Sequence, residues 1–279
     1  MNHPVYILKA DGVREPFDPS KLIYSLHNAG VTGNTVDDVV QHVQTHIKDG
    51  MTTGEIYSYA FHYLRSHSLP IALRYSLRRA LSELGPNGFP FEKFVAEIFK
   101  AKGYEVLTDQ VVQGACVQHE IDVVAWNDKE LIMVEAKFHN EFGLKSDLKV
   151  ALYIKARFDD LRHQTFTFGG KSRTMTDGWL VTNTKFTDQA IKYGSCQQLK
   201  MVGWNYPHGA SLQDLIEGSG LHPFTCLGTL TANHKKQLLD KGIILCRDIK
   251  RNPHVLKEIS MSTEEIAKVF AEIDTVCGA

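Results

Sequence analysis

Two apolar stretches, IDVVAW at Ile121–Trp126 and LIMVEAK at Leu131–Lys137, decide the fold of this chain. Each has the length and the aliphatic character of a β-strand, and the short polar turn between them predicts a hairpin. Continuous apolar runs of this kind are typical of strands that are buried on both faces of a sheet. Charged side chains enter the second strand only at its end, at Glu135 and Lys137.

Three charged residues are expected to meet at that end of the hairpin. Residues i and i+2 of a strand share a face, so Glu135 and Lys137 point the same way, and the antiparallel partner brings Asp122 beside them. Charged residues that close a buried strand need partners or a function. Two carboxylates and a lysine suit metal-assisted phosphodiester hydrolysis, because carboxylate oxygens bind Mg²⁺ and the lysine can orient or deprotonate the attacking water.

The helix before these strands offers a fourth residue, Glu97. At ~100° per residue, Glu97 lies about 120° from the centre of the apolar stripe at residues 91–99, so we expect it to face the sheet. The alternative is an ordinary ion pair between Glu135 and Lys137, with Asp122 solvated. The order of the elements that carry these residues, a helix with Glu97, a strand with Asp122, a strand with Glu135 and Lys137, and then a helix and a strand, favours a site for phosphodiester hydrolysis over an ordinary ion pair.

Strands and helices alternate around the hairpin. The predicted order is αβββαβαβ between residues 87 and 209, which indicates an α/β domain. Its expected elements are a helix at 91–99, strands at 104–107, 121–126 and 131–137, a helix at 147–161, a polar loop at 169–178, a strand at 179–183, a helix at 187–193 and a strand at 200–206.

This central segment resembles the PD-(D/E)XK restriction-endonuclease superfamily, specifically its Mrr-like branch. The resemblance rests on FEKFVAEIFKAKGYEV at 91–106, HEIDVVA at 119–125, VEAK at 134–137 and GWLVTNTKFT at 178–187. It implies a core of αβββαβ order and a DNA substrate. It also implies that Asp122 and Glu135 bind Mg²⁺ or Mn²⁺, that Lys137 is the catalytic lysine and that Glu97 is an auxiliary acid. The segment CVQHE at 116–120 departs from the glycine-rich turn of the family, and a structural role is favoured for His119.

The first 86 residues predict a hairpin followed by four helices. Apolar residues flank an Asp-Gly turn within residues 5–17, and Asp18-Pro19 then provides a cap and a first-turn proline for a helix. Further helical patterns continue to residue 84, and a Gly/Pro-rich linker at 84–90 ends the segment.

The pattern VxxxKxDGxxExFxxxK at 5–21 resembles the ATP-cone, an allosteric nucleotide-binding domain. The resemblance implies an ATP or dATP pocket lined by Lys9, Glu15, Phe17, Lys21 and Thr53, with Tyr57 nearby. Because the chain has no P-loop, the nucleotide is expected to be an effector and not a fuel. Ala10 stands where the family usually has a basic residue, and loss of such a contact (~1.5–3 kcal/mol) weakens binding about ten- to a hundred-fold. A domain that only dimerises is the alternative.

Residues 210–279 predict a small helical domain, for which we consider a helix-hairpin-helix type that presents backbone amides to DNA phosphates. Lys235, Lys236 and Lys241 form either a local basic edge for DNA or an ordinary solvated face. These two alternatives are left open by the sequence.

The charge balance limits the kind of DNA binding that is possible. Lys plus Arg number 31 and Asp plus Glu 32, for a net charge of −1, and no third of the chain is basic. This excludes a protein that coats DNA broadly and leaves room for a local contact. The five cysteines include no CxxC pair, which favours reduced thiols in the cytoplasm.

Taken together, these patterns predict an α/β multidomain protein that is a Mg²⁺-dependent DNA endonuclease modulated by ATP or dATP. We expect no membrane association and a homodimer or higher homo-oligomer. The competing hypothesis is a non-enzymatic, nucleotide-sensing DNA-binding regulator with an inactive nuclease fold.

Overall fold

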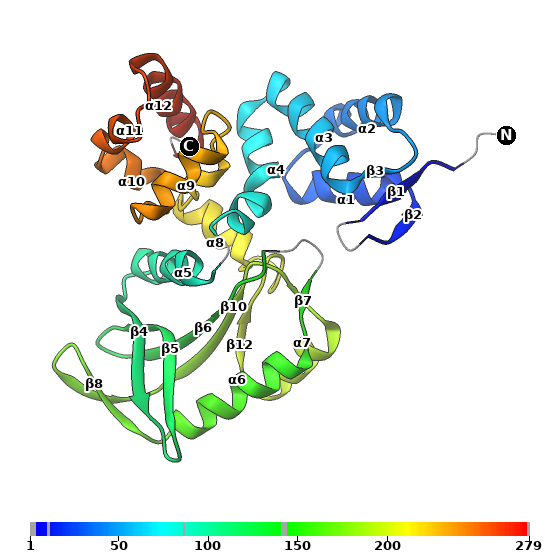
Figure 1. Cartoon of the computed structure of the whole chain (residues 1–279). Coiled ribbons are helices and arrows are strands. Elements are labelled where there is room, and N and C mark those ends of the chain that lie inside the picture. Colours follow the sequence, from blue (N-terminus) through cyan, green and yellow to red (C-terminus); the bar gives the residue numbers. More distant parts are fainter. Residues whose placement is uncertain (1–3, 10–11, 86, 141–143, 278–279) are drawn as a thin grey trace.

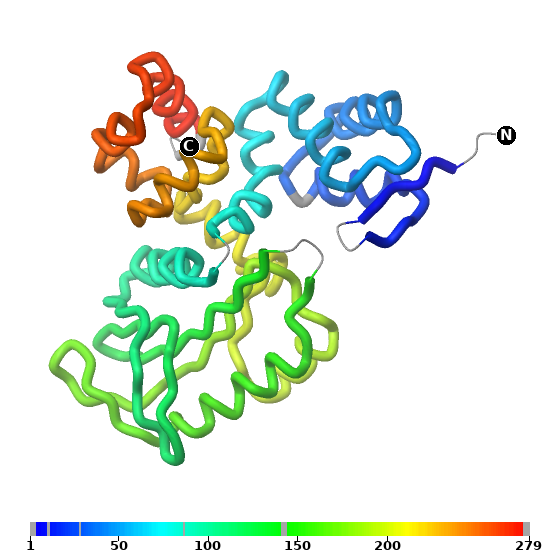
Figure 2. Tube along the Cα trace, viewed as in Figure 1, coloured from blue at the N-terminus to red at the C-terminus, as the bar shows by residue number. Residues whose placement is uncertain are grey.

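The computed structural model describes residues 4–9, 12–85, 87–140 and 144–277, in three parts (Figure 1). A central α/β part, mostly green, carries a twisted sheet. The N-terminal part (blue to cyan) and the C-terminal part (orange to red) are far apart in sequence, yet both lie on the same side of it, with helix α4 (Leu69–Ser82) between them (Figure 2).

The central sheet has the strand order β12-β10-β6-β5-β4, so that β6 is its middle strand. Strands β4, β5 and β6 are antiparallel neighbours, whereas β10 runs parallel to β6 and β12 parallel to β10. The predicted hairpin is therefore confirmed, as β5 and β6. The bounds are Glu105–Gln113 for β4, Gln118–Trp126 for β5, Leu131–Lys137 for β6, Asp177–Thr182 for β10 and Lys200–Val202 for β12.

Helices cover both faces of this sheet. Side chains alternate along the strands, so Val123 and Val134 pack in the core under α5, whereas Val124 and Met133 pack in the core under α6 and α7. Burial on both faces explains why β5 and β6 are almost continuously apolar. The helices are α5 (Phe89–Ala101), α6 (Leu148–Leu161) and α7 (Asp188–Cys196).

Three local predictions in this part were wrong. The last strand, expected at 200–206, ends at Val202, beyond which Gly203 and Tyr206 form only an isolated bridge. The strand expected at 104–107 extends to Gln113, because the edge strand β4 is stabilised by pairing with β5 and not by an apolar sequence. The loop expected at 169–178 contains half of a hairpin, β8 (Thr165–Phe168) and β9 (Lys171–Thr174). A short parallel pair, β7 (Lys145–Ser146) and β11 (Lys185–Phe186), completes the strands.

The N-terminal part is the expected hairpin plus four helices. Strands β1 (Tyr6–Leu8) and β2 (Arg14–Pro16) pair antiparallel, and β3 (Met51–Thr52) joins β1 in parallel. Asp18 caps α1, since its carboxylate accepts from the Ser20 N–H at 2.9 Å. The helices are α1 (Pro19–Asn28), α2 (Asn34–His46), α3 (Thr53–His67) and α4.

The C-terminal part is helical, as predicted, and Ser262 and Glu265 form a capping box. Its elements are α8 (Leu212–Ser219), the 3₁₀ turn η1 (Phe224–Cys226), α9 (Ala232–Asp240), α10 (Cys246–Arg251), α11 (His254–Glu258) and α12 (Thr263–Cys277).

Helix α4 joins the three parts. Ala72 belongs to the N-terminal core, Ala80 to the C-terminal core, and Leu77 and Leu81 to the core that contains α5. The Thr225 hydroxyl donates to the Ala80 carbonyl at 2.6 Å, which adds a buried hydrogen bond across the contact with η1. A helix with buried residues on several sides is a core element shared by its neighbours.

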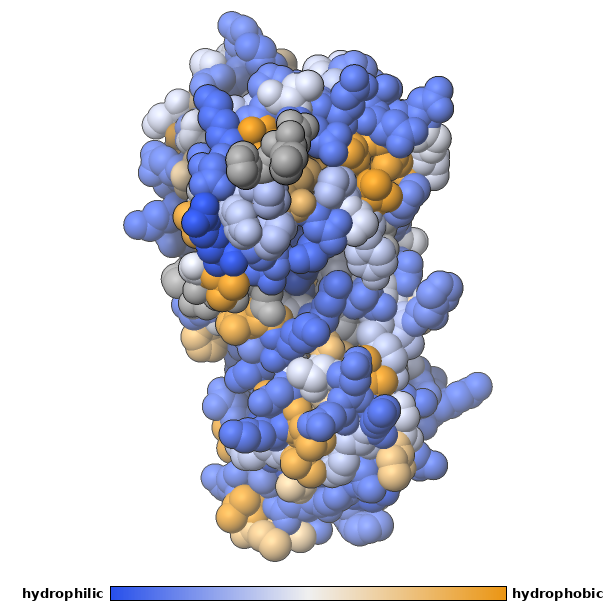
Figure 3. Space-filling view, turned by 90° about the vertical axis from the view of Figure 1, so that its right-hand side faces the viewer, coloured by the Kyte–Doolittle hydropathy of each residue, from blue (hydrophilic) through white to orange (hydrophobic). Residues whose placement is uncertain are grey.

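The face of the molecule shown in Figure 3 is mainly hydrophilic. On the face shown in Figure 3, hydrophobic residues occur in separate groups among hydrophilic ones. In the described ranges, no helix is both long enough and apolar enough to cross a membrane.

The shared role of α4 predicts a large stability effect at Leu77, which is fully buried. Leu77→Ala should lower the free energy of unfolding by about 2–5 kcal/mol, through lost burial and the cavity that remains. Leu152→Ala, at a 44% exposed leucine, is the matched control and should change it by less than about 0.5 kcal/mol. Urea denaturation followed by circular dichroism makes the comparison, and equal effects of the two substitutions would contradict the packing described.

Candidate active site

A polar hollow of about 290 Å³ lies where β6 ends, beside the N-terminus of α5. It is lined by Gly88, Glu92, Asp122, Glu135, Ala136, Lys137, Phe138 and Asn140. Three carboxylates and one lysine therefore open into the same space.

The strand ends bring Asp122, Glu135 and Lys137 together, as the sequence predicted. The pairing of β5 with β6 ends at Val123 and Val134. The next position on each strand, beyond the last pair, is Asp122 on β5 and Glu135 on β6. The Ala136 N–H donates to Asp122 Oδ2 at 2.7 Å and fixes that carboxylate against β6. These three residues form one constellation.

Glu97 does not line this hollow, and the prediction for it is corrected here. Its carboxylate is 2.7 Å from Lys100 Nζ and also pairs with Arg247 of α10, so it links α5 to the C-terminal part. The acid of α5 that faces the strand end is Glu92, in the first turn of the helix. Glu92 and Glu97 are five positions apart, so at ~100° per residue their side chains point about 140° apart around the helix. Only one of the two can therefore face the site.

Glu92 fits closely against the start of its own helix. A Cβ at Gly88 would lie 2.9 Å from Glu92 Oε1, so a larger residue at position 88 would crowd this carboxylate. Glu92 also hydrogen-bonds the side chain of Asp109, on β4. The paired positions of β4 and β5 skip Asp109 and Asp122, and Asp109 has a left-handed φ of 56°. This irregularity brings a further acid to the site, which a regular strand pattern does not predict.

Arg157, on α6, is the other functional residue that the sequence analysis missed. Its Nη1 donates to Glu135 Oε2 at 2.6 Å, and its guanidinium also contacts the Glu120 carbonyl oxygen. The residue lies 22 positions after Glu135, on a different element, so no local spacing pattern links the two.

The carboxylates of the site are held in an environment that disfavours charge. Burial, and then repulsion from Asp122, raises the pKa of Glu92 to about 7. The same two causes, in the same order, raise the pKa of Glu135, with Arg157 opposing them. Burial raises the pKa of Asp122, and the Ala136 N–H counteracts it. Full ionisation of all three carboxyls is therefore disfavoured in the absence of a further cation.

The donor set fits a hard divalent cation. Asp122 and Glu135 supply carboxylate oxygens, the ligands that Mg²⁺ and Mn²⁺ prefer, and a bound cation would relieve their repulsion. Within the described ranges, no group of three or more His, Cys, Asp or Glu side chains meets in metal-binding geometry. A metal here would rest on the two carboxylates and on water, which suits Mg²⁺ because it keeps several waters.

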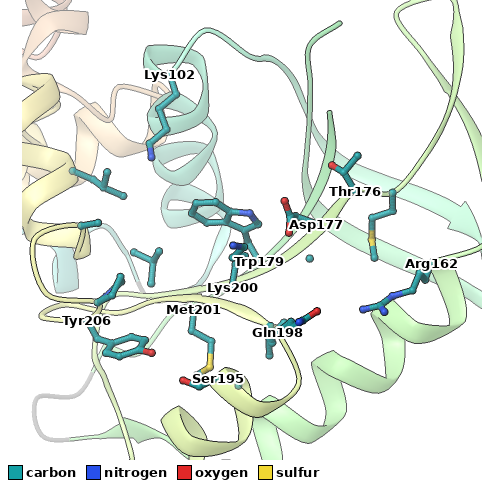
Figure 4. A pocket seen from close by; sticks show the side chains of 18 residues that line it. Lys102, Arg162, Thr176, Asp177, Trp179, Ser195, Gln198, Lys200, Met201 and Tyr206 are labelled. Carbon is teal, nitrogen blue, oxygen red and sulfur yellow. The ribbon is translucent and has the colours of Figure 1, made fainter. Parts of the chain in front are cut away.

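A second, larger hollow of about 680 Å³ lies away from these acids, along β10 and β12 (Figure 4). Asp177 and Gly178, at the beginning of β10, line it, whereas Thr182 at the other end of β10 pairs with Lys137. Figure 4 shows Lys102, Lys200 and Arg162 spread around Trp179, with Asp177 as the acid among the labelled side chains. Without a carboxylate pair, this hollow does not suit metal-assisted hydrolysis, despite its size.

Lys9 and Thr53, both expected to bind nucleotide, directly follow β1 and β3, whereas Glu15 lies on β2, at the opposite edge of the small sheet from β3. Glu15 bridges two lysines, with Lys21 Nζ at 2.8 Å and Lys9 Nζ at 3.2 Å, and these contacts lower its pKa. Leu8 pairs with Thr52, so Lys9 and Thr53 are neighbours at the ends of parallel strands. Phe17 is partly buried against this core. Ala10, on which the question of nucleotide affinity depends, lies outside the described residues.

Tyr57 is engaged in an aromatic cluster. Its ring stacks on Tyr75 at 5.0 Å between centroids, and the Arg79 guanidinium lies 5.0 Å from the Tyr57 ring centre. The partners of Tyr57 in this cluster, Tyr75 and Arg79, belong to α4 and not to the group formed by Lys9, Glu15 and Lys21.

Two of the three lysines considered as a basic edge of the C-terminal part are ion-paired. Lys235 Nζ is 2.8 Å from Glu83 of the chain segment after α4, and Lys241 Nζ is 2.6 Å from Glu258. Their charge is thus partly used within the protein. The helix-hairpin-helix hypothesis stays a prediction.

Three family profiles match successive parts of the chain. The ATP cone domain matches residues 5–84, the restriction endonuclease family Mrr_cat matches residues 86–205, and a family described as AF1548-like, C-terminal matches residues 222–277. Both resemblances stated from the sequence are confirmed, and the last segment matches a family that the sequence analysis did not name.

Among relatives, the chain is 37% identical over 185 residues to an uncharacterized protein of Archaeoglobus fulgidus, a match that covers 66% of this chain and all of that protein. It is also similar to a solved structure entitled "Crystal Structure of Protein of Unknown Function AF1548", with 36% identity, a TM-score of 0.55, and coverage of 69% of this chain and all of that one. Neither name states an activity.

The raised pKa of Glu92 predicts that its effect on stability depends on pH. A carboxyl whose folded pKa (about 7) exceeds its ordinary value of 4.5 stabilises the fold at low pH, and this contribution is lost as pH rises from about 4.5 to about 7. In metal-free buffer, Glu92→Gln should therefore flatten the fall in thermal midpoint across this range. The exposed-helix variant Glu264→Gln is the control, and identical pH profiles for wild type and Glu92→Gln would contradict the assignment.

Proposed function

We propose that this chain, which belongs to the family of Mrr-like restriction endonucleases and carries an N-terminal ATP cone, hydrolyses phosphodiester bonds in DNA with the help of a divalent metal ion. The observation that carries this proposal is the convergence of Asp122, Glu135 and Lys137 at one strand end, with Glu92 facing them from α5.

Each of these residues has a role that follows from its position. Asp122 and Glu135 would hold Mg²⁺ or Mn²⁺, since both line the hollow and their ionisation is disfavoured until a cation accompanies them. When bound there, such an ion would lower the pKa of a water and offset negative charge on the scissile phosphate. Lys137 shares the hollow with Glu135, so its ammonium can orient the attacking water and stabilise negative charge on the phosphate.

Glu92 is proposed as the auxiliary acid in place of Glu97. With a pKa raised to about 7, it exchanges a proton near neutral pH more readily than an ordinary glutamate. Its position opposite Asp122 lets it accept a hydrogen bond from a water in the hollow. Glu97 instead holds α5 against Arg247.

The N-terminal part is proposed to bind ATP or dATP as an effector. Lys9 and Lys21 converge on Glu15, and both ammonium groups can turn to the phosphates of a nucleotide when it arrives. Helix α4 connects this part to the core of α5, which gives nucleotide binding a packed route toward the site.

Plasmid cleavage in Mg²⁺ tests the nuclease proposal. Lys137→Ala should reduce the rate about 10²- to 10⁴-fold, the usual contribution of a positioned proton-transfer group. Glu92→Gln should also slow cleavage, whereas Glu97→Gln, on the same helix but turned away, should retain most of the rate. Nicking by Lys137→Ala at the wild-type rate would indicate a contaminating nuclease or the non-enzymatic regulator.

Calorimetry tests the nucleotide proposal separately. Lys21→Ala should weaken ATP or dATP binding about ten- to a hundred-fold through loss of one charge-assisted contact. Lys171→Ala, which removes an exposed ion pair with Asp128 in the central part, is the matched control and should bind like wild type. If the wild type releases no heat at millimolar nucleotide, the ATP cone has lost its ligand, as Ala10 allows.

A further inference from the structure

Arg157 connects the helix α6 to the acidic cluster in a way that an ordinary surface ion pair does not. Its side chain is 12% exposed, and Glu135, its partner, is 15% exposed. The guanidinium bonds the Glu135 carboxylate on one side and the Glu120 carbonyl oxygen on the other. Arg157 thus supplies positive charge directly to one of the two carboxylates that the proposed function assigns to the metal.

The backbone that carries Arg157 is fixed by Asp160, one turn later on the same helix. The Asp160 carboxylate accepts from the Cys116 N–H at 2.8 Å and from the Val117 N–H at 3.3 Å, and pairs with His119 Nε2 at 2.8 Å. Gly114 lies in the turn between β4 and β5. A Cβ at this position would lie only 2.1 Å from Asp160 Oδ2, so this turn packs closely against Asp160. The reach of Arg157 to Glu135 is therefore set by the fold.

A carboxylate that is hydrogen-bonded to a guanidinium is a poorer metal ligand than a free one, because the two cations compete for the same oxygens. Burial and the neighbouring Asp122 make the charged form of Glu135 unfavourable in the metal-free protein unless a cation accompanies it. The pair with Arg157 relieves that repulsion in the metal-free protein.

We propose that Arg157 is a positioning residue. Its guanidinium holds the Glu135 carboxylate until the divalent ion binds, and the ion then displaces the guanidinium from that carboxylate. This inference rests on the proposed function. Tyr153, one turn earlier on α6 and 63% exposed, lies 5.6 Å from the guanidinium and marks the outward side of the helix. Once displaced, the guanidinium moves toward that side, where its forked donors suit a DNA phosphate.

The test is calorimetric titration of the purified full chain with Mn²⁺ alone, without DNA. Arg157→Gln should bind Mn²⁺ more tightly than wild type, by roughly five-fold or more, as expected for loss of a competing interaction. Arg157→Lys keeps a cation near Glu135 and should stay closer to wild type. Arg162→Gln, which alters a 49% exposed arginine directly after the end of the same helix, is the matched control and should leave the affinity unchanged.

Each outcome bears on the inference. A purely structural role of Arg157 predicts weaker Mn²⁺ binding by Arg157→Gln, because Glu135 would lose its orientation. Unchanged or weaker binding by this variant therefore overturns the inference. The nuclease proposal still stands in that case if the wild type binds Mn²⁺ and cleaves DNA. If wild type binds no Mn²⁺ and cuts no plasmid, both fail. Should Arg157→Gln unfold, as seen by circular dichroism, the tighter binding is required of Arg157→Met, which keeps the length of the side chain without its charge, and its absence counts against the inference.

Discussion

The acidic cluster at the ends of β5 and β6 is the constraint around which the central part is arranged. Carboxylates that are partly buried side by side raise one another's pKa and oppose folding unless cations or donors accompany them. The protein supplies the Ala136 N–H to Asp122 and the Arg157 guanidinium to Glu135. A divalent ion bound to these carboxylates would favour their ionised forms, and this would link the stability of the site to its proposed chemistry.

The helices that hold the cluster are themselves tied to the rest of the chain. Helix α5, which carries Glu92, shares a core with Leu77 and Leu81 of α4 and is paired through Glu97 with Arg247 of the C-terminal part. Because packed cores transmit small displacements, both flanking parts are in mechanical contact with the element that bears an acid of the site. Under the proposed function, this arrangement would give a nucleotide bound to the ATP cone a physical connection to the restriction-endonuclease-like part.

Much of this could be predicted from the sequence, because the deciding residues are local. The apolar runs at 121–126 and 131–137 predict β5 and β6, and the i, i+2 rule places Glu135 and Lys137 on one face. The sequence pointed to Glu97 and not to Glu92 because both border the apolar stripe. Only tertiary contacts distinguish them: Glu97 pairs with Arg247, whereas Glu92 lines the hollow. Arg157 was missed because its contact spans two elements, and the skipped pairing at Asp109 is set by the backbone of an edge strand.

The central claim is that Asp122 and Glu135 together bind a divalent metal ion at this strand end. Anomalous diffraction from crystals of the full chain soaked in Mn²⁺ tests it most directly. The account predicts a peak within coordination distance, about 2.1 Å for a small hard cation, of an oxygen from each carboxylate. A structure with Mn²⁺ bound elsewhere, or with none between these residues at saturating concentration, would contradict it.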